Sequence, residues 1–179
     1  MIRAFGPLFH EAADPVRLVL VGGSSFTDGY VASLHELAGA DPRVVLAGYV
    51  FGPALAELYS NAAVFVQPSA LEGLPLTLLE AAAYRVPVVA SDIAPHREVL
   101  HRPGPGARLF GSGRVEELSR ALAVVLRDLP IERAGARLVG DDVRRRYDWD
   151  AAAEATESLY RSLLGRPGDR ELVRDGVRP

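Results

Sequence analysis

Two residue types are missing from this 179-residue sequence: it contains no Cys, and its 20 basic residues are all Arg, so it contains no Lys. The absence of Cys excludes disulfides, thiolate metal ligands and Cys nucleophiles. The absence of Lys excludes a P-loop lysine and a Schiff-base lysine. No apolar run approaches the roughly 20 residues needed to span a bilayer, and charged residues interrupt the first stretch before the apolar core of a signal peptide develops. We therefore expect a cytoplasmic protein without a transmembrane segment.

A strong charge of either sign is also missing. The sequence has 23 acidic and 20 basic residues, a formal net charge of -3, which argues against a general nucleic-acid binder and against a polybasic membrane anchor. Hydrophobic residues make up 49% of the chain, enough for one domain with a sizeable core. The His residues are scattered without metal-ligand spacing, so we expect no metal site.

Short, Val-rich apolar runs alternate with helical patterns along the chain. The runs predict strands at residues 16–22, 43–47, 63–67, 87–91 and 107–110. Helical spacing predicts helices at residues 29–39, 53–61, 75–84, 114–128, 131–146 and 149–164. Runs without polar alternation suit strands that are buried on both faces, and strands that alternate with helices imply right-handed crossovers. The sequence therefore predicts an α/β fold: a doubly wound parallel sheet of five strands with flanking helices.

The two ends of the chain depart from this pattern. Residues 2–13 have the apolar spacing of an amphipathic helix, although a doubly wound domain normally opens with a strand. The last residues, 165–179, are charged and nearly devoid of core residues, and we expect them to be disordered. Residues 1–164 are expected to form one domain.

The segment from Pro68 to Asp92 carries the most chemical information. Glu72 lies in a loop, and Glu80 lies eight residues later in an apolar helix, where a buried carboxylate would need a partner. The helix start, at Pro75, offers free amides and the positive end of the helix dipole, which suit a diphosphate. Carboxylates on either side would suit the hydroxyls of a sugar and a ribose. Taken alone, two Glu residues favour a simpler interpretation, in which Glu80 lies on a solvated helix face and Glu72 is an ordinary loop residue. The surrounding motifs change this interpretation.

Four motifs in this segment resemble the nucleotide-sugar-binding half of the retaining GT-B glycosyltransferases of family 4. They are Pro68-Ser69, Glu72-Gly73, Glu80-Ala81 and Pro87–Asp92. The signature of that family is two Glu separated by seven residues, as Glu72 and Glu80 are. The resemblance covers roughly residues 1–164. It implies a Rossmann-like domain that binds the donor of a hexosyltransferase, a nucleotide-diphosphate sugar such as a UDP- or GDP-hexose, without a further cofactor or metal.

The resemblance also implies a role for each matching residue. Glu72 would contact the donor sugar and help to stabilise charge as the glycosidic bond breaks, and Glu80 would bind the ribose hydroxyls. Backbone amides facing the sugar and diphosphate would come from Gly73, Leu74, Leu76 and Thr77. The base would be edged by Gly48, Tyr49 and Val50, and room near the nucleotide would be left by Gly22 and Gly23.

The sequence departs from the family pattern in three respects. Pro75 stands where family members often have a second Gly, and Arg85 stands where a Gly commonly ends the helix; a left-handed backbone at Arg85 would cost about 1 kcal/mol or more. The acceptor-binding half, and the first strand of the donor domain with its Arg and Lys, have no counterpart after Met1. Because that strand is central, we expect an unpaired gap in the sheet, and a chain that is inactive without its missing domain or a partner chain.

Two other interpretations stay open. The chain is alternatively a non-catalytic half, an assembly subunit that docks a separate acceptor-domain chain, or part of another GT-B enzyme such as a sugar-nucleotide epimerase. Peripheral membrane contact is compatible with the full enzyme. The triplet His96 to Glu98 is interpreted as a solvated turn, with Glu98 close to the donor site as the alternative.

Overall fold

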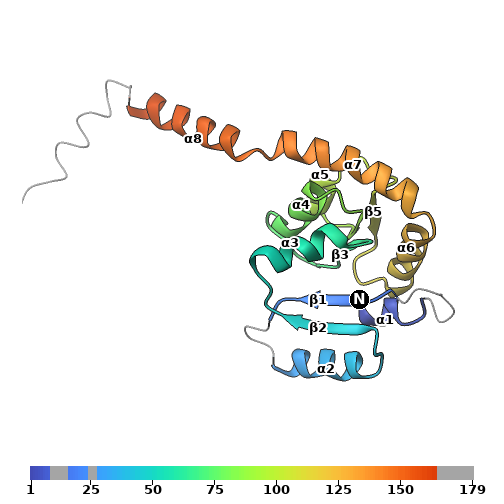
Figure 1. The fold of residues 1–179 in the computed structure, drawn as a ribbon. Helices are drawn as coiled ribbons and strands as arrows, with labels where there is room; N and C mark the ends of the chain where they lie inside the picture. Colours follow the sequence, from blue (N-terminus) through green and yellow to red (C-terminus); the bar gives the residue numbers. More distant parts are fainter. Residues whose placement is uncertain (9–15, 24–27, 165–179) are drawn as a thin grey trace, which may run out of the picture. The chain divides into compact units, whose positions relative to one another are not determined.

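A computed structural model describes residues 1–8, 16–23 and 28–164 of the chain (Figure 1). These residues fall into two compact units, Met1–Val143 and the unit that begins at Arg144. The second half of the helix predicted at residues 2–13 and the disorder predicted for residues 165–179 lie outside the described residues.

The described residues contain five strands, all paired in parallel, as the sequence predicts. The strands are β1 (Leu18–Val21), β2 (Val44–Gly48), β3 (Phe65–Gln67), β4 (Val88–Ser91) and β5 (Ala107–Phe110). They form two sheets: β1 pairs with β2 (Figure 1), and β4 lies between β3 and β5. In the described part of the chain, no strand pairs with the outer edges of β1 and β3. The prediction of five parallel strands with flanking helices is therefore confirmed, and an unpaired gap of the kind expected separates the two sheets.

Helices connect the strands. They are α1 (Ile2–Phe5), α2 (Asp28–Gly39), α3 (Gly52–Asn61), α4 (Leu76–Ala83), α5 (Ala94–Val99), α6 (Val115–Arg127), α7 (Leu129–Arg146) and α8 (Trp149–Leu164). The predicted bounds agree to within two residues, except for α1 and α5. The interpretation of the residues around His96 as a solvated turn is wrong, because they form α5 and the His96 side chain is fully buried.

Burial differs sharply between the two sheets. All four residues of β4 are buried, since the strand has a neighbour on each side. In β1 the side chains alternate, and Val19 and Val21 are 39% and 46% exposed. Burial on both faces is thus confirmed for β4 and wrong for β1, whose side chains alternate between partly buried and exposed.

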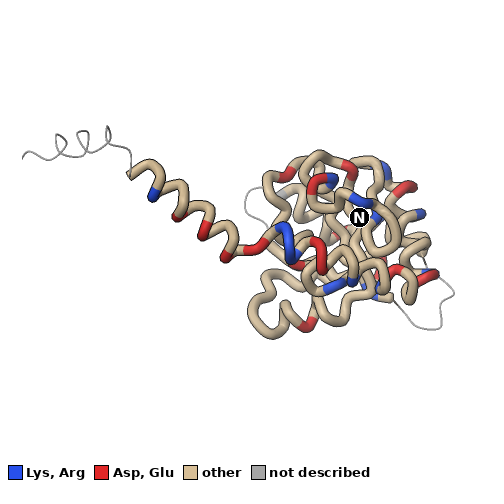
Figure 2. The backbone as a smooth tube through the Cα atoms, turned by 90° about the horizontal axis from the view of Figure 1, so that it is seen from above, with Lys and Arg blue, Asp and Glu red and all other residues tan. Residues whose placement is uncertain are grey.

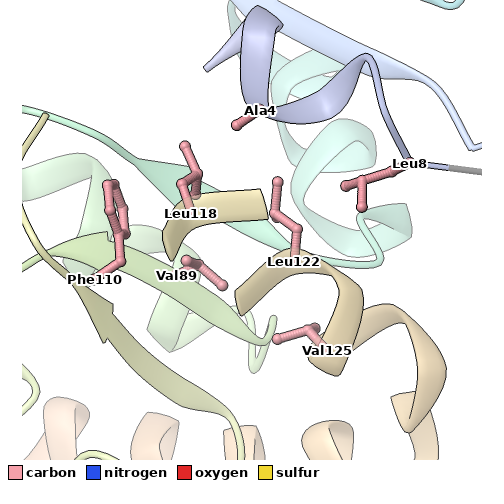
Figure 3. Close-up of a cluster of buried hydrophobic side chains, with 7 residues drawn as sticks. All are labelled: Ala4, Leu8, Val89, Phe110, Leu118, Leu122 and Val125. Atoms are coloured by element: carbon pink, nitrogen blue, oxygen red, sulfur yellow. The ribbon is translucent and has the colours of Figure 1, made fainter. Parts of the chain in front are cut away.

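Two clusters of buried hydrophobic side chains belong to the core of the described residues, one beside each sheet. The first joins β4 and β5 to α6, as Figure 3 shows; its buried members are Ala4, Leu8, Val89, Phe110, Leu118, Leu122 and Val125. The second packs β1 and β2 against α2; its members include Ile2, Phe5, Leu18, Leu20, Leu34, Leu37 and Val44. The segment that begins with α1 therefore contributes to both clusters and joins the two sheets.

Arg43, just before β2, holds that segment in place. Its guanidinium donates hydrogen bonds to the carbonyl oxygens of Gly6, at 2.9 Å, and Leu8. It also lies over the Phe5 ring, 4.8 Å from the centroid, where a cation is attracted to the aromatic face. The two-stranded sheet is thus tied to the first helix by polar as well as apolar contacts.

Acidic and basic residues are interspersed along the described backbone (Figure 2), which agrees with the formal net charge of -3. Among the helices of the described ranges, none has both the length and the apolar character that a bilayer crossing requires.

Candidate functional site

The residues predicted to form the site lie at the carboxyl ends of the strands. Gly22 and Gly23 follow β1, Gly48 ends β2, and the loop with Glu72 follows β3. Because the strands of each sheet run in parallel, their carboxyl ends share one edge of the sheet. Ligands of open α/β sheets bind beyond this edge.

The carboxylate of Glu72 is half-buried and has a fixed partner. The side-chain amide of Gln67, the last residue of β3, donates to Glu72 Oε1 at 2.7 Å and to Ser69 Oγ at 3.2 Å. The Thr77 hydroxyl, in the first turn of α4, donates to Gln67 Oε1 at 3.0 Å. Two of the predicted residues, Glu72 and Thr77, are therefore brought together through Gln67, which the sequence motifs do not identify. The sequence feature that could have identified Gln67 is a polar side chain at the end of an apolar strand.

A second set of hydrogen bonds supports this loop from the buried side. The Ser91 hydroxyl, at the end of β4, donates to the carbonyl oxygen of Ser69. His96 Nδ1 lies 2.8 Å from the carbonyl oxygen of Ser91, so this nitrogen carries the proton and donates it. The other ring nitrogen, Nε2, is buried and makes no hydrogen bond to a described residue. The start of the loop is thus anchored to the most buried strand of the fold.

Glu80 lies on the exposed face of α4, whereas the neighbouring Leu78 and Ala81 are buried. Its carboxylate still has a partner, because the Tyr59 hydroxyl of α3 donates to Glu80 Oε2 at 3.0 Å. Tyr59 is buried and stacks on Tyr84, with ring centroids 5.2 Å apart. Burial raises the pKa of Tyr59, and the hydrogen bond to Glu80 raises it further. Tyr59 therefore remains a donor, and it holds one carboxylate oxygen of Glu80 in place.

The backbone amides at the start of α4 are only partly available. The N–H of Leu76 donates to the carbonyl oxygen of Leu74 at 2.9 Å, so the expectation that Leu76 presents a free amide is wrong. The reason is the tight turn centred on Pro75, in which Leu74 and Leu76 are hydrogen-bonded to each other just before the helix begins. The N–H groups of Gly73, Leu74 and Thr77 make no hydrogen bond within the described part of the chain, and they remain candidates for an anionic ligand.

The glycines predicted near the nucleotide also come together. The N–H of Gly22 donates to the carbonyl oxygen of Gly48 at 2.8 Å, and both residues have a positive φ, +129° and +65°, which favours glycine. At Gly23, however, a Cβ would lie 2.3 Å from the Tyr49 ring. The expected room at Gly23 is therefore filled by Tyr49.

Beyond β2, an aromatic pair lies on the surface. Tyr49 stacks on Phe51, with centroids 6.1 Å apart and planes 10° apart, and the two residues are 66% and 74% exposed. Val50 between them is partly buried. The predicted base-binding residues therefore offer an aromatic face in addition to their backbone.

A cavity of about 300 Å³ is lined by Leu20 of β1 and by Pro68, just after β3. Residues of α1 and α2 complete the wall, together with Val115. None of the predicted site residues lines this cavity, so the Glu72 network is a surface site beside it.

The fold places the chain in a class of proteins. Parallel α/β strands with flanking helices match structures of GT-B glycosyltransferases. The crystal structure of Alr3699/HepE from Anabaena, in complex with UDP and glucose, superimposes with a TM-score of 0.75 at 22% identity, covering 82% of this chain and 41% of that protein. At this identity the likeness concerns the fold alone.

The sequence identifies the family. The profile of the glycosyl transferases group 1 matches residues 1–128, and the chain belongs to this family. It is 29% identical over 153 residues to MJ1607 of Methanocaldococcus jannaschii, described as an uncharacterized glycosyltransferase, with 84% of this chain and 39% of the relative covered. It is 34% identical over 128 residues to LpcC of Rhizobium leguminosarum bv. viciae, a lipopolysaccharide core biosynthesis mannosyltransferase, with 72% and 36% covered. The chain thus spans well under half the length of these relatives.

Proposed function

We propose that this chain is the donor-binding part of a retaining glycosyltransferase that transfers a hexose from a nucleotide-diphosphate sugar to an acceptor. The observation that carries the proposal is the pair of carboxylates near α4. Glu72 is held by Gln67 before the helix, and Glu80 is held by Tyr59 within it. Carboxylates held in this way are acceptors for sugar and ribose hydroxyls on either side of a diphosphate.

In the proposed complex, Glu72 contacts the donor sugar and Glu80 the ribose. The diphosphate lies near the start of α4, where the N–H groups of Gly73, Leu74 and Thr77 and the helix dipole favour negative charge. The base lies near Tyr49 and Gly48. The chemical step then depends on positioning the donor and on stabilising the leaving diphosphate.

The identity of the donor is proposed from the relatives. HepE was crystallised with UDP and glucose, and LpcC is a mannosyltransferase, so a UDP- or GDP-hexose is the proposed donor. The chain spans well under half the length of its relatives. We propose that transfer requires an acceptor-binding domain, either in the same polypeptide or in a partner chain. We also propose that the reaction takes place in the cytoplasm.

A thermal-shift titration with UDP-glucose, GDP-mannose and ADP-glucose tests this proposal. One donor should raise the melting temperature of the wild-type chain, and the Glu80→Ala variant should lose most of that shift. Glu57→Ala is the matched control, because Glu57 is an exposed carboxylate of the neighbouring α3. The absence of a shift with every donor, or an equal shift in Glu80→Ala, would sink the proposal.

A second candidate, an assembly subunit without donor binding, is favoured by one observation, the unpaired edges of β1 and β3. Such edges are sites for pairing with a strand of another polypeptide. The same titration separates the candidates: an assembly subunit would show no donor shift in the wild-type chain or in either variant.

A further inference from the structure

We propose that Gln67 is a positioning residue that orients the Glu72 carboxylate toward the sugar of the donor. This inference rests on the proposed function, since it assigns a role within the same site. Gln67 does not itself contact the donor in this proposal. It acts through Glu72, whose Oε1 accepts a hydrogen bond from the Gln67 amide at 2.7 Å.

The hydrogen bonds around Gln67 define the direction of its amide. A carboxylate offers only acceptors, so the end of the amide that faces Glu72 must be the NH₂ group. The Gln67 oxygen then faces Thr77, and it accepts the Thr77 hydroxyl hydrogen at 3.0 Å. The second NH₂ hydrogen is directed to Ser69 Oγ at 3.2 Å. Each polar atom of the Gln67 side chain therefore has a partner, and the amide cannot flip without losing contacts.

The loop itself gives Glu72 little support. Leu71 is almost fully exposed, and Gly73 is exposed as well. Among the described residues, the Gln67 amide is the one hydrogen-bond partner of the Glu72 side chain. Without that contact, the carboxylate of a loop residue would sample several rotamers, and ordering it on binding would cost side-chain entropy.

Gln67, in contrast, stands on a rigid base. It is the last residue of β3 and is paired with Ala90 of β4, a fully buried strand. The adjoining Ser69 carbonyl is held by Ser91. Gln67 therefore transmits the position of the sheet to Glu72. Glu72 Oε2 has no partner in the described part of the chain, which leaves it free to accept a hydrogen bond from a sugar hydroxyl.

The test separates binding of the sugar from binding of the nucleotide. Calorimetry gives Kd for the donor that produces the largest thermal shift, UDP-glucose or GDP-mannose, and for the matching free UDP or GDP. In Gln67→Leu, which keeps the approximate size of the side chain and removes its polar atoms, the affinity for the donor should fall on the order of tenfold. The affinity for the free nucleotide should stay within about twofold of wild type, because Glu80 and the helix start are unchanged.

Gln67→Glu adds a readout that a merely structural role would not produce. It places two carboxylates at hydrogen-bond distance, and such a pair shares one proton, which raises a pKa of the pair. At about pH 5 the shared proton should hold Glu72 in place, and toward pH 8 repulsion should displace it. The preference for donor over free nucleotide should therefore decline with rising pH in Gln67→Glu but not in wild type.

Asn61→Leu is the control, because Asn61 carries the other side-chain amide of the chain and bonds only the Glu57 carbonyl oxygen, outside the site. If Gln67→Leu fails to fold, Thr77→Val, which removes the hydroxyl that fixes the Gln67 oxygen, should show a smaller loss of the same preference. An unchanged ratio of donor to nucleotide affinity in the folded variants would overturn the role of Gln67 alone. If the wild-type chain bound neither the donor nor the free nucleotide, the proposed function itself would be refuted.

Discussion

The two sheets show that the more apolar strand is not the more buried one. β1, Leu-Val-Leu-Val, is wholly aliphatic, yet Val19 and Val21 are 39% and 46% exposed. β4, Val-Val-Ala-Ser, contains a serine, yet each of its residues is buried. The difference lies in the neighbours: β4 is paired on both edges and covered by helices, whereas β1 is paired on one edge within the described residues. Burial is therefore set by the packing of the surroundings and not by the hydrophobicity of the strand itself.

The same contrast divides the candidate site. The part with fixed side-chain hydrogen bonds, from Gln67 to Glu72, stands on the three-stranded sheet. The glycine pair Gly22 and Gly48 and the exposed Tyr49 stand on the two-stranded sheet. We infer that the part of the candidate site on the three-stranded sheet, proposed to face the sugar, is more rigid than the part on the two-stranded sheet, proposed to face the base.

The largest expected effect distinguishes the cores of the two sheets. Leu78→Ala, in the helix α4 that contacts β3 and β4, removes a fully buried side chain and should reduce the free energy of unfolding by about 4 kcal/mol. Leu20→Ala, in β1, removes a partly buried side chain that lines the cavity of about 300 Å³, and it should cost only about 1 kcal/mol. Urea denaturation measures both. Equal losses in the two variants would contradict the contrast.

The next largest effect on the free energy of unfolding is expected at a buried ion pair beside the three-stranded sheet. Glu132 of α7 is 1% exposed and accepts hydrogen bonds from Arg108 of β5 and from the N–H of Gly106; Arg108 is 30% exposed. Arg108→Met leaves a carboxylate buried without its charged partner and should cost about 3 kcal/mol. Glu132→Gln leaves an arginine that water can reach and should cost about 2 kcal/mol. Denaturation in urea should show this order, and a reversed order would refute the asymmetry.

Much of the fold could be predicted from the sequence, because local patterns specify it. The run at residues 107–110 predicts β5 without error, and the helical spacing at 149–164 predicts α8. α5 could not be predicted in the same way, since its six residues are too few to show a period and its buried His96 has charged neighbours in the sequence. The division into two sheets depends on hydrogen bonds between distant segments, which apolar runs do not encode.

The sequence motifs predict the two carboxylates of the candidate site but not the side chains that hold them. Glu72 and Glu80 are predicted from their spacing together with the surrounding motifs, and the structure gives each a hydrogen-bond partner. The partners themselves, Gln67 and Tyr59, lie in different elements from the carboxylates they hold. The sequence also predicts space beside Gly23 that the structure does not have. The Tyr49 ring fills this space, and only the packing of side chains reveals it.

A smaller effect concerns the turn that connects α4 to the buried β4. Arg85 has a φ of +60°, as the missing helix-ending glycine suggests, and its guanidinium pairs with Asp141 on the surface, at 2.8 Å. Arg85→Gly removes both the strain and the exposed ion pair, whereas Arg85→Ala removes only the ion pair. Because exposed pairs contribute little, Arg85→Gly should be more stable than Arg85→Ala by about 1 kcal/mol. Thermal denaturation of both variants decides this, and equal stability would show that the turn is unstrained.

The smallest effect is expected at the surface end of β4, where the rigid sheet meets solvent. Asp92 accepts two hydrogen bonds from Arg97, one of them at 2.8 Å, and this interaction lowers the pKa of Asp92 and raises that of Arg97. A carboxylate whose pKa is lowered in the folded state stabilises it above the unfolded-state pKa, and the contribution is lost as the pH falls through the folded-state value. Arg97→Ala should therefore raise the pKa of Asp92, measured by NMR titration, and weaken the acid dependence of unfolding that this carboxylate causes. An unchanged pKa in Arg97→Ala would show that the pair is not formed in solution.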